Sequence, residues 1–153
     1  MHITLETDYA IRIVDTLAKE AAKERSSFRG CIDAGTISER TEIPLRFALK
    51  ILRKLVGGGI VKSYKGVYGG YRLIAKLEEL SIYDVIELVE GEYRFSRCLS
   101  EGYNCSCGSD NDLPCSYRQV FAGVTDMVRD YLKKQTFDKL VKLDDIEKTL
   151  KNN

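Results

Sequence analysis

The chain has 153 residues, 44% of them apolar and 31% charged, and 24 basic against 23 acidic side chains give a net charge of +1. This length fits one domain, or one domain with an appended helical arm, and so balanced a charge neither favours nor excludes nucleic-acid binding. No run of about 18 apolar residues is present, which excludes a membrane-spanning helix, and the polar start does not resemble a signal peptide. We therefore expect a cytoplasmic protein with no membrane partner.

Helical patterns dominate the first part of the chain. Apolar residues at positions 11, 14, 17 and 18 recur at helical spacing behind Thr7 and Asp8, either of which could cap this first helix. A short helix is predicted at 36–41. After a turn, Pro44 suits the first turn of a third helix at 45–56, which we expect to bury Phe47 and Leu49 among its apolar residues and to end at glycines 57–59.

Two short extended segments follow, at 60–64 and 71–73, and a Gly-rich connection joins them. A fourth helix is predicted at 81–89. Helix, short helix, turn, helix and hairpin is the order of a winged helix-turn-helix. We therefore predict a mainly α fold with a small β-hairpin, in which residues 1–90 form the DNA-binding domain.

The last part of the chain reads as a long helix at 117–134 and a shorter one at 137–150. The long helix is amphipathic and has no obvious partner within the chain, so pairing with its copy in a second subunit is the expected solution. This predicts a homodimer in which residues 116–153 form the dimerisation helix and tail, and the first helix also packs with this region. Residues 91–115 then form a cysteine-rich loop between the two parts.

The predicted third helix has a basic face that suits DNA. It contains no acidic residue between 45 and 56, although the whole chain is charge-balanced, and it follows a tight turn as a recognition helix does. An ordinary solvated basic face is the alternative interpretation. Basic and aromatic side chains on the hairpin favour DNA, because they can reach phosphates or the minor groove. The predicted DNA contacts are Arg46, Lys50, Arg53, Lys65, Tyr68 and Arg72.

Four of the five cysteines fall in the run CLSEGYNCSCGSDNDLPC, at Cys98, Cys105, Cys107 and Cys115. Their gaps of six, one and seven residues are poor zinc-knuckle spacing, whereas a thiolate-rich loop suits an iron–sulfur cluster. A disulfide, or reactive thiols without a metal, are the alternatives. The single residue between Cys105 and Cys107 makes it hard for both to bind one cluster, so one of them is expected to be spare.

Several motifs resemble the IscR/NsrR/RirA/CymR family of bacterial winged-helix regulators, over nearly the whole chain. The start HITLETDYAIRIVDTLA resembles the family's opening, and IDAGTISERTEIPLRFALKILRKLVGGGIV resembles its helix-turn-helix. The segment KSYKGVYGGYRL resembles its wing, and TFDKLV resembles the close of its dimerisation region.

The resemblance implies three cluster-binding cysteines, Cys98, Cys115 and either Cys105 or Cys107 in the middle. It also exposes a departure, because Arg118 stands where the iron–sulfur biogenesis regulators carry a histidine ligand, and a guanidinium cannot replace it. The resemblance then points to Asp8, which matches an N-terminal aspartate that reaches the cluster across the dimer in the nitric-oxide-sensing branch. The spare cysteine is a rival fourth ligand, and helix capping is the plainer role for Asp8. Leu49 replaces a recognition-helix glutamate of the biogenesis regulators, so the operator preference is expected to differ.

Together these features predict a DNA-binding transcriptional regulator, in the direction of a repressor, that binds a palindromic double-stranded operator as a homodimer. An iron–sulfur cluster, 2Fe–2S or 4Fe–4S and easily lost on purification, would control binding in response to redox state, nitric oxide or iron–sulfur status. The alternative is a cluster-free regulator of the same fold that responds to thiol or sulfur-metabolite status. With one histidine, at position 2, and no nucleophile–base arrangement, an enzyme is not expected.

Overall fold

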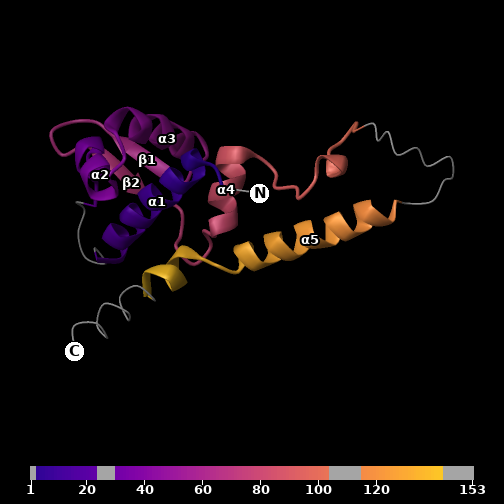
Figure 1. Cartoon of the computed structure of the whole chain (residues 1–153). Helices are drawn as coiled ribbons and strands as arrows, with labels where there is room; N and C mark the ends of the chain where they lie inside the picture. Colours follow the sequence, from indigo (N-terminus) through magenta and orange to yellow (C-terminus); the bar gives the residue numbers. More distant parts are fainter. Residues whose placement is uncertain (1–2, 24–29, 104–114, 143–153) are drawn as a thin grey trace.

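The computed structural model describes residues 3–23, 30–103 and 115–142, which form helices and one small hairpin (Figure 1). In chain order the elements are α1 (Leu5–Lys23), α2 (Ala34–Thr41), α3 (Leu45–Gly57), β1 (Val61–Tyr64), β2 (Gly70–Leu73), α4 (Ile82–Glu90), the 3-10 turn η1 (Arg97–Leu99) and α5 (Ser116–Lys133). Residues 137–142 are also helical. The predicted class, a mainly α winged helix-turn-helix with a long additional helix, is confirmed.

The helix-turn-helix is built by local signals at both ends of α2. The Asp33 carboxylate caps this helix by accepting a hydrogen bond from the Thr36 backbone N–H at 3.0 Å. Glu42 ends it in the left-handed conformation, with φ of 57°. Pro44 then occupies the N-cap of α3, one position before the place that its fixed φ favours most.

The core lies where α1 crosses α2 and α3. Ala48, Ile51, Leu52 and Leu55 of α3 are buried, against a face of α1 whose Ala10, Ile13 and Val14 are fully buried. The predicted apolar face of α3 was therefore partly wrong, because Ala48 lies at its centre while Leu49 is only half-buried and Phe47 is exposed. Phe47 instead lies at the edge of the core, with its ring centroid 6.4 Å from that of Tyr9.

The hairpin of β1 and β2 is antiparallel, with Val61 paired to Leu73 and Tyr64 to Gly70. It is fixed to the helices through Tyr71, which exchanges backbone hydrogen bonds with Ile32 at 2.8 and 3.0 Å. Gly70 permits this contact, because a Cβ at that position would lie 2.6 Å from the Ile32 carbonyl oxygen, and its φ of 150° disfavours other residues. The hairpin therefore projects as a wing from the helical core.

Beyond the wing, α4 packs on α1 at the side of the core, and α5 contacts α4 and extends away from the core (Figure 1). Ser81 starts α4 with a capping box, in which its hydroxyl and backbone N–H both bond to Asp84. After α5 the chain returns, and Thr136 pairs with Ser81 while Phe137 is buried in the core. No helix in the described part of the chain is both long and apolar enough to cross a membrane.

The first turn of α1 begins earlier than the sequence suggested. The helix starts at Leu5, and the Thr4 hydroxyl accepts a hydrogen bond from the Thr7 backbone N–H at 3.3 Å. Thr4 is therefore the capping residue, and the prediction that Thr7 or Asp8 caps the helix was wrong. Asp8 lies inside the helix and forms an ion pair with Arg12, one turn later, at 2.8 Å.

Candidate DNA interface and cysteine segment

The outer face of α3 is basic, as predicted. Arg46, Lys50 and Arg53 are all exposed, and α3 contains no acidic residue to offset them. The Arg46 guanidinium lies over the Phe47 ring, 4.6 Å from its centroid, so the exposed aromatic ring gives this side chain a platform. The helix can therefore present cationic side chains toward a polyanion.

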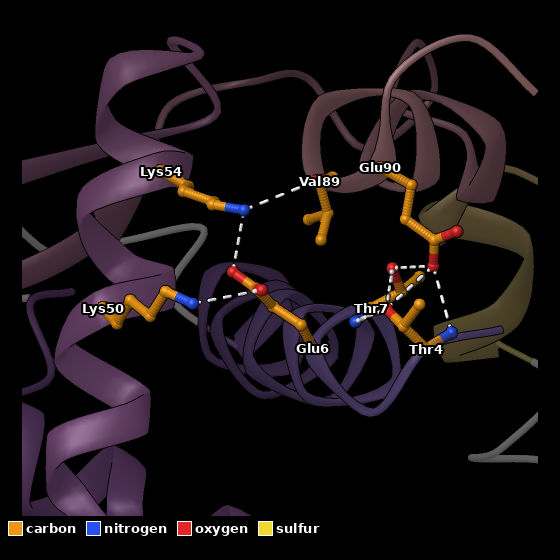
Figure 2. A network of polar contacts seen from close by, with 7 residues as sticks. All are labelled: Thr4, Glu6, Thr7, Lys50, Lys54, Val89 and Glu90. Carbon is orange, nitrogen blue, oxygen red and sulfur yellow. Dashed lines mark hydrogen bonds and ion pairs between the residues drawn. The ribbon is translucent and has the colours of Figure 1, made fainter.

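One acidic side chain reaches this basic helix from outside it. Glu6, in the first turn of α1, accepts from Lys50 Nζ through Oε2 at 3.2 Å and lies 2.8 Å from Lys54 Nζ through Oε1 (Figure 2). Lys54 Nζ also donates to the Val89 carbonyl of α4 at 3.4 Å. The close ammonium group of Lys54 is the main reason that the pKa of Glu6 lies below its usual range, so the carboxylate is charged at neutral pH.

The same turn of α1 is held on its other side by α4. Glu90 Oε1 accepts hydrogen bonds from the Thr4 backbone N–H at 3.0 Å, the Thr4 hydroxyl at 2.9 Å and the Thr7 hydroxyl at 2.5 Å (Figure 2). Desolvation raises the pKa of Glu90, but these bonds outweigh it and hold the pKa below its usual range. Sequence reasoning missed both Glu6 and Glu90, and the only advance signal was the acidic first turn of α1 beside a helix free of acidic residues.

The wing presents the other predicted contacts. Lys65 and Arg72 are exposed, and so is Tyr68, with 85% of its surface accessible. Val67, beside Tyr68 at the tip, is 96% exposed. An apolar pair at the tip of a basic hairpin suits contact with the sugar walls of a groove, since the flanking cations can meet phosphates. The wing and α3 therefore supply two basic surfaces on one domain.

Two of the four predicted cysteine ligands lie in the described residues. Cys98 is half-buried in η1, where the Ser96 hydroxyl accepts from its backbone N–H at 3.4 Å, and Cys115 is exposed at the N-cap of α5. Both are free thiols. Cys105 and Cys107 lie outside the described residues.

The segment that carries Cys98 is fastened to α5. The Phe95 backbone N–H donates to the buried Thr125 hydroxyl at 3.1 Å, and the Phe95 and Phe121 rings pack at a tilt with centroids 5.5 Å apart. Since η1 also packs on α5, the chain on each side of the 104–114 segment is attached to this helix (Figure 1). Cys98 and Cys115 are thus presented from one support.

The described residues do not by themselves complete a metal site. Within 3–23, 30–103 and 115–142, no group of three or more His, Cys, Asp or Glu side chains is arranged to hold a metal ion. Asp8 instead pairs with Arg12, and Arg118 is exposed on the first turns of α5. A complete ligand set would need the middle thiol and a fourth donor from elsewhere.

Comparison with known proteins decides the family. A family model named Rrf2 and described as "Iron-dependent Transcriptional regulator" matches residues 3–143. The chain belongs to the Rrf2 family. Rrf2 proteins are DNA-binding transcriptional regulators rather than enzymes, which agrees with the expectation from the sequence.

Individual relatives agree with this assignment. An Rrf2-like HTH-type transcriptional regulator of Rhodobacter capsulatus is 31% identical over 123 residues, covering 80% of each chain. The HTH-type transcriptional regulator IscR of Pectobacterium atrosepticum is 27% identical over 141 residues, covering 92% of this chain and 79% of the relative. The solved structure of CymR, described as the global cysteine regulator of Bacillus subtilis, superposes with a TM-score of 0.72 at 22% identity, covering 94% of this chain and 98% of that one. At this identity the likeness to CymR shows that the fold is shared.

The long helix of this Rrf2 chain leaves one face open. Thr125 is the buried residue of α5, while Tyr117, Val120, Met127 and Tyr131 are exposed. With the half-buried Val124 between them, these residues recur at alternating steps of three and four, the spacing of a coiled-coil seam. We name this set the α5 seam.

Proposed function

We propose that this Rrf2 regulator is a homodimeric repressor of palindromic DNA sites and that an iron–sulfur cluster in its cysteine segment controls its binding to DNA. One observation carries the proposal. The first turn of α1 is bonded both to the recognition helix α3, through Glu6, and to the end of α4, from which the chain leads to Cys98. A change in the cysteine segment therefore has a short structural route to α3.

The α5 seam supports the homodimer. Apolar side chains at this spacing gain most when they interdigitate with a second helix, and residues Tyr117–Tyr131 of a second copy offer the same self-complementary surface. Two recognition helices related by a twofold axis would then face two half-sites of a palindrome. On this proposal Arg46 and Arg53 supply contacts from α3, where Lys50 lies on the same exposed face, and Lys65, Tyr68 and Arg72 supply contacts from the wing.

The proposed ligands are of the chemical type that binds iron–sulfur clusters. Cys98 and Cys115 are free, accessible thiols on a common support, and thiolates are the usual ligands of such clusters. With Cys105 or Cys107 as the middle ligand, these residues would hold the group, and Asp8 of a second subunit is the proposed fourth donor. Once bound, the cluster would supply redox and ligand-exchange chemistry on iron. The protein's part is to hold the thiols and to pass a change in their spacing through α5 and α4.

The test is anaerobic reconstitution with iron and sulfide, followed by the visible spectrum and by iron and sulfide analysis. We expect a coloured wild-type protein, and colourless Cys98→Ala and Cys115→Ala variants whose far-ultraviolet circular dichroism is unchanged. Cys31→Ala is the matched control, because Cys31 is a half-buried free thiol outside the segment, and this variant should keep the colour. A colourless wild-type protein would refute the cluster and leave the DNA-binding regulator in place.

A cluster-free thiol regulator is the second candidate. Arg118, which stands where the iron–sulfur biogenesis regulators carry a histidine ligand and cannot itself act as one, favours it. IscR and CymR relatives share the fold, so the fold does not choose between the two candidates. This candidate predicts that iron loading leaves DNA affinity unchanged, whereas oxidation of the cysteines alters it.

A further inference from the structure

The two lysines that Glu6 binds differ in their surroundings. Lys54 is 37% exposed and is fixed a second time, by its hydrogen bond to the Val89 carbonyl. Lys50 is 60% exposed and lies one turn earlier on the outer side of α3, with its Nζ turned back toward Glu6 Oε2 (Figure 2). Lys54 therefore holds the carboxylate in place. Lys50 is the exposed cation whose ammonium group the carboxylate binds.

The position of Glu6 in the fold keeps its ion pair with Lys50 in place. Its Oε1 is buried, its side chain as a whole is 30% exposed, and α1 and α3 pack directly on one another, so the carboxylate is held in place by the core rather than by a flexible loop. The ion pair with Lys50 spans 44 positions of sequence, unlike the pairs within one helix such as Asp15 with Lys19. Exposed surface pairs contribute little on their own, whereas this carboxylate is shared by two lysines and carried by two packed helices, so its geometry is held.

We propose that Glu6 is a positioning residue that keeps Lys50 away from DNA. Its carboxylate binds the Lys50 ammonium group, which would otherwise bind a phosphate. This inference rests on the proposed DNA-binding function. In the complex, Arg46 and Arg53 would meet DNA from α3 while Lys50 stays with Glu6. The recognition helix would then neutralise fewer phosphates than its sequence suggests, and non-specific affinity would be restrained.

The test measures how binding to a labelled duplex of mixed sequence falls with potassium chloride concentration. Each neutralised phosphate contributes about 0.9 to the slope of log affinity against log salt, independently of sequence, so no operator is needed. We expect Glu6→Gln to steepen the slope by about 0.9 and to bind more tightly at low salt. Asp15→Asn removes the same charge from the same helix, but its ion pair lies within α1, and it should keep the wild-type slope.

The double variant Glu6→Gln with Lys50→Gln identifies the released charge. It should return to the wild-type slope, because Lys50 is the cation that Glu6→Gln frees. A purely structural Glu6 would weaken binding at all salt concentrations without steepening the slope. The proposal is overturned if Glu6→Gln and Asp15→Asn have the same slope, or if the double variant stays as steep as Glu6→Gln.

A second comparison covers the case in which Glu6→Gln does not fold. In the wild-type background, Lys50→Gln should leave the slope unchanged, whereas Arg53→Gln should lower it by about 0.9. Arg53 is exposed on the same helix and has no ion-pair partner among the described residues. Equal slopes for these two variants overturn the inference. Absence of any binding by the wild-type protein would refute the proposed function itself, which a changed or unchanged slope does not do.

Discussion

Helices α3 and α5 are both amphipathic, but within the described residues the apolar face of α3 is covered while that of α5 is largely exposed. In α3 the apolar face is closed by α1, and Ala48, Ile51, Leu52 and Leu55 are buried. In α5, Thr125 is the buried residue and the α5 seam is exposed. The contrast shows that the described chain buries the apolar face of α3 in its own core, whereas the α5 seam would be covered only in the proposed dimer.

The largest difference should appear in stability. Leu52→Ala removes a fully buried side chain from the core and should lower the free energy of unfolding by about 2–5 kcal/mol at every protein concentration. Met127→Ala, in the α5 seam, should act through the dimer, so its effect should vary with protein concentration. Urea unfolding at two concentrations measures both. A concentration-independent effect of Met127→Ala would remove the contrast.

The next effect concerns assembly. Val120→Glu combined with Met127→Glu places like charges in the α5 seam of both subunits and should convert a dimer into a monomer, since two carboxylates cannot be desolvated together. Light scattering after size exclusion gives the mass directly. Asp126→Gln with Asp130→Gln, on the polar side of the same helix, is the control and should remain dimeric. A dimer that survives the Glu substitutions would place the interface elsewhere.

A smaller effect separates the wing from the rest of the surface. Lys65→Gln should lower the salt slope of DNA binding by about 0.9, because it removes one proposed phosphate contact. Lys76→Gln removes an equal charge from an exposed lysine that pairs with Glu79 and should leave the slope unchanged. Anisotropy titrations over a salt series measure both. Equal effects would mean that net charge, rather than the wing, governs binding.

The smallest effect is on acid stability. The folded pKa values of Glu6 and Glu90 are lowered, so their contribution to stability is present above the ordinary value of 4.5 and is lost as pH falls through the folded values. Glu6→Gln should therefore flatten the loss of stability on acidification. Glu39→Gln, an exposed side chain on α2, should not. Urea midpoints measured from neutral pH downward test this, and identical curves for the two variants would contradict it.

The sequence predicted those parts of the molecule that depend on local signals. Pro44 and the glycines near the wing fix turns within a few residues, and periodicity located α2, α3, α4 and α5 to within about two residues of their observed ends. The network around Glu6 and Glu90 could not be predicted in this way. It joins residues more than 40 positions apart, and only the packing of α1 against α3 and α4 brings them together.

The cysteine segment shows the same division. Spacing identified Cys98 and Cys115 as candidates, because residue type and separation are visible in the sequence. The attachment of Phe95 to Thr125 and Phe121 was not predicted. A hydrogen bond between a backbone N–H and a hydroxyl 30 residues away produces no recognisable sequence pattern. Cys105 and Cys107 lie outside the described residues, so the choice of middle ligand stays a prediction.

The most direct test of the central claim compares DNA affinity with and without the cluster. An operator selected from a random duplex library by the anaerobically reconstituted protein would be titrated with that protein, and again after the iron has been removed by a chelator. We predict that removal changes the affinity for this operator at least about tenfold, corresponding to about 1.4 kcal/mol of coupling. The same treatment should leave the Cys98→Ala variant unchanged. Equal affinity of the loaded and stripped wild-type protein would contradict control by an iron–sulfur cluster.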